Sequence, residues 1–194
     1  LLKRYPEKVE AVVKAAVHTY PNKYKQIMLG AITAEPALIC DVVEIIIQAD
    51  VAPNAKVVEI AIRAEPAYAK EIVKIAAQQN PDEIANIVRI AIITEPFVAD
   101  SIMDDSMLSY PGQMLEILTA AISAIPNQVT NLVTDTLALF PDNADEVVST
   151  AVNQSEGHHS RDIVKAAVES GISEGSAIAD AIEGGADKAL FATN

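Results

Sequence analysis

Carboxylates are the residues of this chain with the most chemical potential, and they gather in one part of it. Residues 90–160 carry ten Asp and Glu and no Lys or Arg, whereas residues 1–89 carry eleven of each sign. Divalent cations prefer carboxylate oxygens, so these acids are the candidate metal ligands. The four best placed are Asp100, Asp104, Asp105 and Asp135. Asp105 and Asp135 would be about 9–10 Å apart by helix-packing distance, so a divalent cation on this acidic surface is a minor alternative.

The other reactive side chains form no recognisable catalytic arrangement. Cys40 is the only cysteine, which excludes an intrachain disulfide, and we expect a semi-buried thiol with no base beside it. His158 and His159 are adjacent, so on a helix they point in different directions, and we expect a solvated helix entry rather than a metal site. The sequence has no HExxH, CxxC, GxSxG or glycine-rich phosphate loop. We therefore predict that the protein is not an enzyme and needs no cofactor.

Prolines reveal the framework that must position these residues. They recur every fifteen residues, except that Pro53 lies two residues after the place that Val51 fills. The ten are Pro6, Pro21, Pro36, Pro53, Pro66, Pro81, Pro96, Pro111, Pro126 and Pro141. Internal repetition this regular predicts a repeat architecture.

Each repeat has the apolar pattern of a short helix. With the proline as position 1, and Val51 in that place for residues 51–65, positions 4, 7, 8, 11 and 12 are mostly apolar. Residues 81–95 are a clear example, and the spacing is that of an amphipathic helix rather than a strand. Proline fits the first helical position and biases the preceding residue away from helix, so each proline begins one helix and ends the last. We predict helices of about 12–13 residues, too short to be stable alone.

The predicted fold is therefore all-α: an α-solenoid, or superhelix, of single-helix repeats that pack on their neighbours. Residues 1–155 form the repeat array, and residues 156–194 form a degenerate repeat and a glycine-punctuated helical cap of the same domain. The shape resembles TPR and HEAT solenoids, although their units are helix pairs and this chain has no Trp.

No membrane span is expected. The longest uncharged run, residues 117–134, contains Pro126 and keeps the repeat spacing, so it is two core helices. The chain begins at Leu1, and Tyr5 precedes a proline as Tyr20 does, from which we expect a processed or truncated N-terminus with an earlier repeat. The compartment is unknown, because a periplasmic, secreted or cytoplasmic location is equally compatible with this sequence.

Position 10 of the repeat changes character along the chain. It holds Ile45, Ile60, Ile75 and Ile90 in four successive repeats, then Asp105 and Asp135. We favour the interpretation that the isoleucines are core residues. The alternative is that the four isoleucines are exposed and form a single line that continues into Asp105 and Asp135. Such a surface would bind a partner that is apolar at one end and basic at the other.

The function that this sequence favours is a non-catalytic helical-repeat scaffold that mediates protein–protein interaction or self-association. Its net charge of −13 disfavours nucleic acid and anionic lipid as partners. An alternative is a structural subunit of a cell-envelope or extracellular assembly, in which the ends of solenoids stack. A weaker alternative is a metal-dependent enzyme that uses the acidic stretch at residues 95–146.

Overall fold

Helices and turns make up the whole described chain. The computed structural model describes residues 8–192, and within that range it contains twelve α-helices and no strand. This confirms the prediction of an all-α helical-repeat fold. Two expectations, the helix start at Pro6 and the earlier repeat suggested by Tyr5, lie outside the described residues. None of the described helices is both long enough and apolar enough to cross a bilayer.

Each regular repeat begins with a tight turn before the α-helix starts. Pro66–Tyr68 is a 3-10 turn, and the α-helix Ala69–Gln79 follows it. Glu65, before the proline, has φ −142° and ψ 80°, outside the helical region, as proline demands of its predecessor. The N–H of Glu65 still donates to Ala61 O at 3.0 Å, so it closes the preceding helix. The α-helices are therefore 10 or 11 residues long and begin about three residues later than predicted.

The chain divides into two compact units, Leu1–Ile102 and Met103–Asn194, with the division inside helix α7. The helices of the first unit are α1 (Val9–Thr19), α2 (Tyr24–Ala34), α3 (Ile39–Gln48), α4 (Asn54–Ala64), α5 (Ala69–Gln79), α6 (Ile84–Thr94) and the start of α7 (Ala99–Ser109). Its 3-10 turns are Pro21–Lys23, Pro36–Leu38, Pro66–Tyr68, Pro81–Glu83 and Pro96–Val98.

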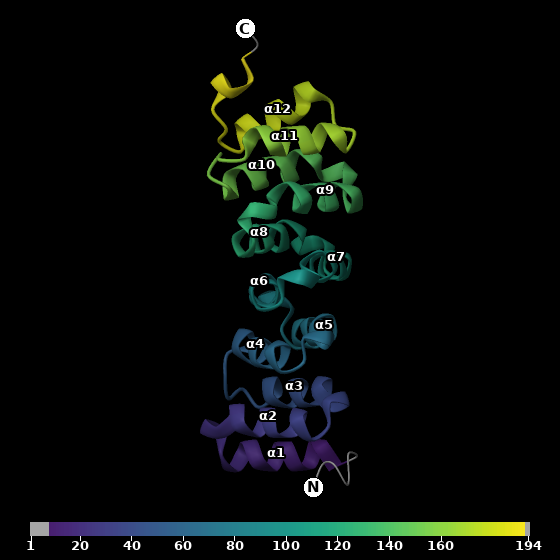
Figure 1. Ribbon diagram of the computed structural model, residues 1–194, viewed down its shortest axis with the longest axis vertical. Coiled ribbons are helices and arrows are strands. Elements are labelled where there is room, and N and C mark those ends of the chain that lie inside the picture. Colours follow the sequence, from purple (N-terminus) through teal and green to yellow (C-terminus); the bar gives the residue numbers. More distant parts are fainter. Residues whose placement is uncertain (1–7, 193–194) are drawn as a thin grey trace. The chain divides into compact units, whose positions relative to one another are not determined.

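Two layers build the first unit. From α1 to α6 each helix packs on the next helix and on the one after that, so α1, α3 and α5 form one layer and α2, α4 and α6 form the other. Figure 1 shows α4 and α6 on one side of this unit and α5 on the other. Residues that repeat every fifteen positions therefore fall alternately on two faces, and residues thirty apart fall on the same face.

The second unit follows the same plan. After the end of α7 come α8 (Met114–Ala124), α9 (Val129–Leu139), α10 (Ala144–Gln154), α11 (Ser160–Glu169) and α12 (Glu174–Glu183). Its 3-10 turns are Pro111–Gln113, Pro126–Gln128, Pro141–Asn143 and Lys188–Phe191. Helices α8, α10 and α12 pack in one layer, and α9 and α11 pack in the other. Without a proline, α12 is capped by Ser173, whose side chain accepts the N–H of Ser176 at 3.2 Å.

Positions 7 and 8 form the core of both units. From α3 to α10 both members of the doublet are buried in every helix, as in Val42-Val43 and Leu132-Val133. In α1 and α2 the first member, Val12 or Ile27, is half-buried. Each fully buried aliphatic side chain contributes about 1.5–3 kcal/mol, so this doublet is the main source of packing energy in each repeat.

The two departures from fifteen-residue spacing share one backbone feature. Asp50, before the late Pro53, and Glu156, a one-residue insertion, have φ of 50° and 51°. These are left-handed conformations that end a helix without proline. After Glu156 the N–H of Gly157 donates back to Val152 O at 3.0 Å. Asp50 takes the ordinary last place of its repeat, so α3 and α4 stay fifteen residues apart, whereas the inserted Glu156 sets α11 sixteen residues after α10.

Candidate functional site

A row of three hollows lies along α1, α3 and α5 in the first unit. The first, about 530 Å³, lies between α1 and α3. The second, about 600 Å³, lies further along the same two helices, and the third, about 650 Å³, lies where α3 ends beside α5. Gln48, exposed near the end of α3, lines all three. We call this surface the α1/α3/α5 face.

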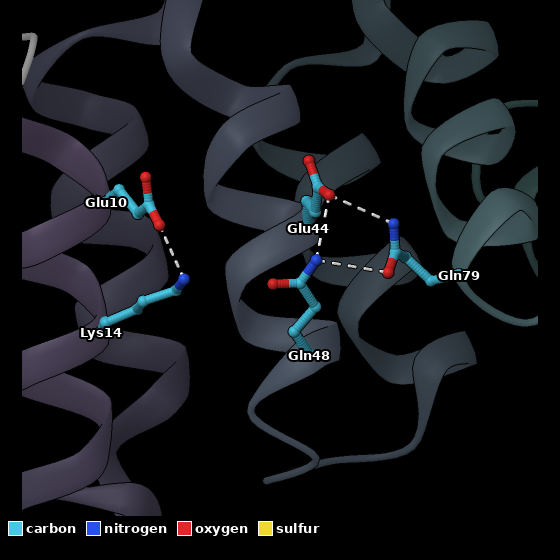
Figure 2. A network of polar contacts seen from close by, with 5 residues as sticks. All are labelled: Glu10, Lys14, Glu44, Gln48 and Gln79. Atoms are coloured by element: carbon cyan, nitrogen blue, oxygen red, sulfur yellow. Dashed lines mark hydrogen bonds and ion pairs between the residues drawn. The ribbon is translucent and has the colours of Figure 1, made fainter.

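A polar network crosses from α3 to α5 on this face, as Figure 2 shows. The Oε1 atom of Glu44 accepts hydrogen bonds from Gln48 Nε2 at 3.0 Å and from Gln79 Nε2 at 3.2 Å. Gln48 Nε2 also donates to Gln79 Oε1 at 3.4 Å. Because Glu44 accepts from both amides, the side chains on two neighbouring helices are held in one arrangement.

Opposite this network, α1 presents an ion pair. Lys14 Nζ lies 2.7 Å from Glu10 Oε1, and the two side chains are 50% and 70% exposed. The proximity of Lys14 lowers the pKa of Glu10 through a hydrogen bond and charge attraction. An exposed pair of this kind contributes little to stability. Both charges can therefore be exchanged for those of a bound molecule at small cost.

The bridge between α3 and α5 is a property of the repeat. Gln48 occupies position 13, and Gln79 occupies position 14 two repeats later. The same two positions meet in the second unit, where Gln154 Nε2 donates to Ser123 Oγ at 2.8 Å. Our sequence reasoning missed Gln48 and Gln79 because a polar residue on a solvent face looks like a solubility feature. The signal is the offset of 31 residues, which has meaning only once the layers are known.

The third hollow is a consequence of the late proline. The loop at residues 49–53 separates α3 from α4, and Asp50, near the start of this loop, has a left-handed conformation. Asp50, Asn54, Asn80 and Glu83 supply polar groups to the lining. The carboxylates can accept from peptide N–H groups, and the amides can both accept from N–H groups and donate to C=O groups.

The position-10 isoleucines lie in two layers. Ile45 and Ile60 are buried, each 5% exposed, which fits the core interpretation, and Ile75 and Ile90 are half-buried. Ile45 and Ile75 belong to the layer of α3 and α5, whereas Ile60 and Ile90 belong to that of α4 and α6. The expectation that the four isoleucines lie on a single line is therefore corrected, because successive helices alternate between layers.

The four candidate metal ligands do not assemble a metal centre. Asp100 and Asp105 are exposed, and Asp104 and Asp135 are half-buried. Across residues 8–192, no three His, Cys, Asp or Glu side chains come close enough together to hold an ion. A cation on the acidic surface stays a prediction without a built site.

The remaining reactive residues are placed as expected. Cys40 is a half-buried free thiol, and burial raises its pKa, with the negative charges of Glu71 and Asp41 adding to the effect. A raised pKa keeps the thiol protonated and unreactive near neutral pH. His158 is exposed, and His159 immediately precedes α11. The histidines therefore lie at a solvated helix entry.

Comparison with known proteins adds no relative: no family model, no curated protein and no solved structure matches the chain.

Proposed function

We propose that this protein is a non-catalytic helical-repeat scaffold that holds a protein partner on the α1/α3/α5 face. The observation that carries the proposal is the row of three hollows that share Gln48. Helical repeats commonly present an extended surface of this kind to a partner. The protonated Cys40 and the solvated histidine pair also favour binding over catalysis.

The chemistry of the face favours an extended peptide segment. Its groups include a cation at Lys14, a carboxylate at Glu44 and the amides of Gln48 and Gln79. Amides both donate and accept, so they match the alternating N–H and C=O groups of an extended backbone. Ile45, beneath the groove between α1 and α3, adds apolar lining for a partner side chain.

Sedimentation velocity tests the scaffold against the alternative of an assembly subunit. We expect the purified chain to keep one sedimentation coefficient as its concentration rises, because a scaffold is a monomer or a small closed oligomer. Continuous growth with concentration would instead support a subunit whose ends stack. Calorimetric titration with Ca²⁺, Mg²⁺ and Mn²⁺ tests the metal-dependent enzyme, and the absence of saturable heat with all three would remove that alternative.

A further inference from the structure

Two large apolar side chains occupy solvent positions near the end of the first unit. Position 2 of the repeat is otherwise small or polar: Asn22, Ala37, Ala52, Ala67, Asp82, Gly112, Asn127 and Asp142. In the repeat that begins at Pro96 it is Phe97, which is 97% exposed. Position 13 is polar in the five preceding repeats, as His18, Thr33, Gln48, Arg63 and Gln78, and is then Ile93, which is 47% exposed.

The core does not explain Ile93 and Phe97. Ile93 lies in the last turn of α6, and Phe97 lies four residues later in the turn Pro96–Val98. The same positions in the other repeats of this unit support the same helices with polar or small residues, so packing does not require an aromatic or aliphatic group there. Large apolar side chains that are exposed four residues apart, where the other repeats of the unit have small or polar residues, are candidates for an interaction site.

The charged residues near Ile93 and Phe97 indicate which kind of molecule could bind there. Between residues 90 and 102 the only charged residues are Glu95, half-buried, and Asp100, exposed. The cation at the position of α4 that corresponds to Ile93, Arg63, is already paired with Glu59 at 3.1 Å. A second copy of the chain would bring its own net charge of −13, so electrostatic repulsion opposes self-association. A segment with Lys or Arg beside an apolar side chain would satisfy both features of the surface.

We infer that Ile93 and Phe97 are a docking site for a protein segment that presents apolar side chains next to Lys or Arg. Phe97 is the anchor, because buried aromatic side chains carry much of the affinity at protein interfaces. Glu95 and Asp100 accelerate the encounter with a basic segment. This inference rests on the proposed scaffold function but concerns residues that line none of the three hollows.

The test uses defined peptides. The probe is a short fluorescein-labelled peptide of leucine and lysine at helical spacing, and the control peptide has serine in place of leucine. Fluorescence anisotropy measures the affinity of both for the wild-type chain and for Phe97→Ser, Tyr20→Ser and Gln48→Ala. Tyr20 is a matched control because it is 57% exposed, also apolar in character, and lies in the first unit. Circular dichroism verifies that each variant is folded, which the exposure of Phe97 leads us to expect.

We expect Phe97→Ser to weaken binding of the leucine–lysine peptide by about tenfold or more. Tyr20→Ser and Gln48→Ala should leave it within about twofold, and the serine–lysine peptide should bind equally weakly to all four proteins. The docking site is wrong if Phe97→Ser binds like the wild type, if leucine gives no advantage over serine, or if Phe97 proves to support self-association. Loss of binding in Gln48→Ala alone would overturn the docking site while leaving the scaffold proposal in place.

Discussion

Ile60→Asp tests whether position 10 belongs to the core. Ile60 is 5% exposed in α4. Losing its buried aliphatic surface costs about 1.5–3 kcal/mol, and an unpaired polar group in its place adds about 1–3 kcal/mol. The expected loss is therefore about 2.5–6 kcal/mol, a large part of the 5–15 kcal/mol typical of a folded domain. Urea denaturation, followed by the helical circular dichroism signal, measures it as a lower midpoint.

Ile93→Asp is the matched control for this experiment. It makes the same chemical change on the next helix of the same layer, where the side chain is 47% exposed. We expect the free energy of unfolding to change by no more than about 0.5 kcal/mol. If Ile60→Asp were as stable as Ile93→Asp, Ile60 would face solvent and the assignment of layers would be refuted.

Two further predictions concern packing and titration. A Cβ at Gly184 would lie 2.8 Å from Ser149 Cα, so Gly184→Ala should lower the free energy of unfolding by about 1–3 kcal/mol and with it the urea midpoint. Gly30, in α2, has open space where a Cβ would stand, so Gly30→Ala should raise the free energy of unfolding by about 0.5–1 kcal/mol. Because folding raises the pKa of Cys40 above 9.0, the unfolded thiol ionises first. Above pH 9.0 the urea midpoint of the wild type should therefore fall more steeply with rising pH than that of Cys40→Ser. An identical pH dependence of the two midpoints would contradict the raised pKa of Cys40.

Most of the fold could be predicted because its causes are local. Proline at position 1 and the apolar doublet at positions 7 and 8 act within one fifteen-residue repeat, so they locate every helix from α2 to α10. The layers could not be predicted in the same way. A period of fifteen looks identical in both layers, which is why Ile45 and Ile60 seemed to follow a single line although α3 and α4 belong to different layers.

The candidate site could not be predicted without knowing which helices share a layer. The bond between Gln48 and Gln79 joins residues 31 apart, and a sequence alone does not show which repeats lie side by side. Ile93 and Phe97 were visible as departures from polar repeat positions, but 51% of the chain is apolar, so two more such residues do not stand out until their exposure is known.

Site-specific photo-crosslinking tests the scaffold proposal most directly. A photoreactive amino acid in place of Gln48 reports on the α1/α3/α5 face, and the same group in place of Thr33 is the control. Thr33 occupies the same repeat position in α2, is exposed, and lines none of the three hollows. In cells that naturally contain this protein, we expect a discrete protein adduct through position 48 and none through position 33. No adduct at position 48, or equal adducts at both positions, would contradict a scaffold that holds its partner on this face.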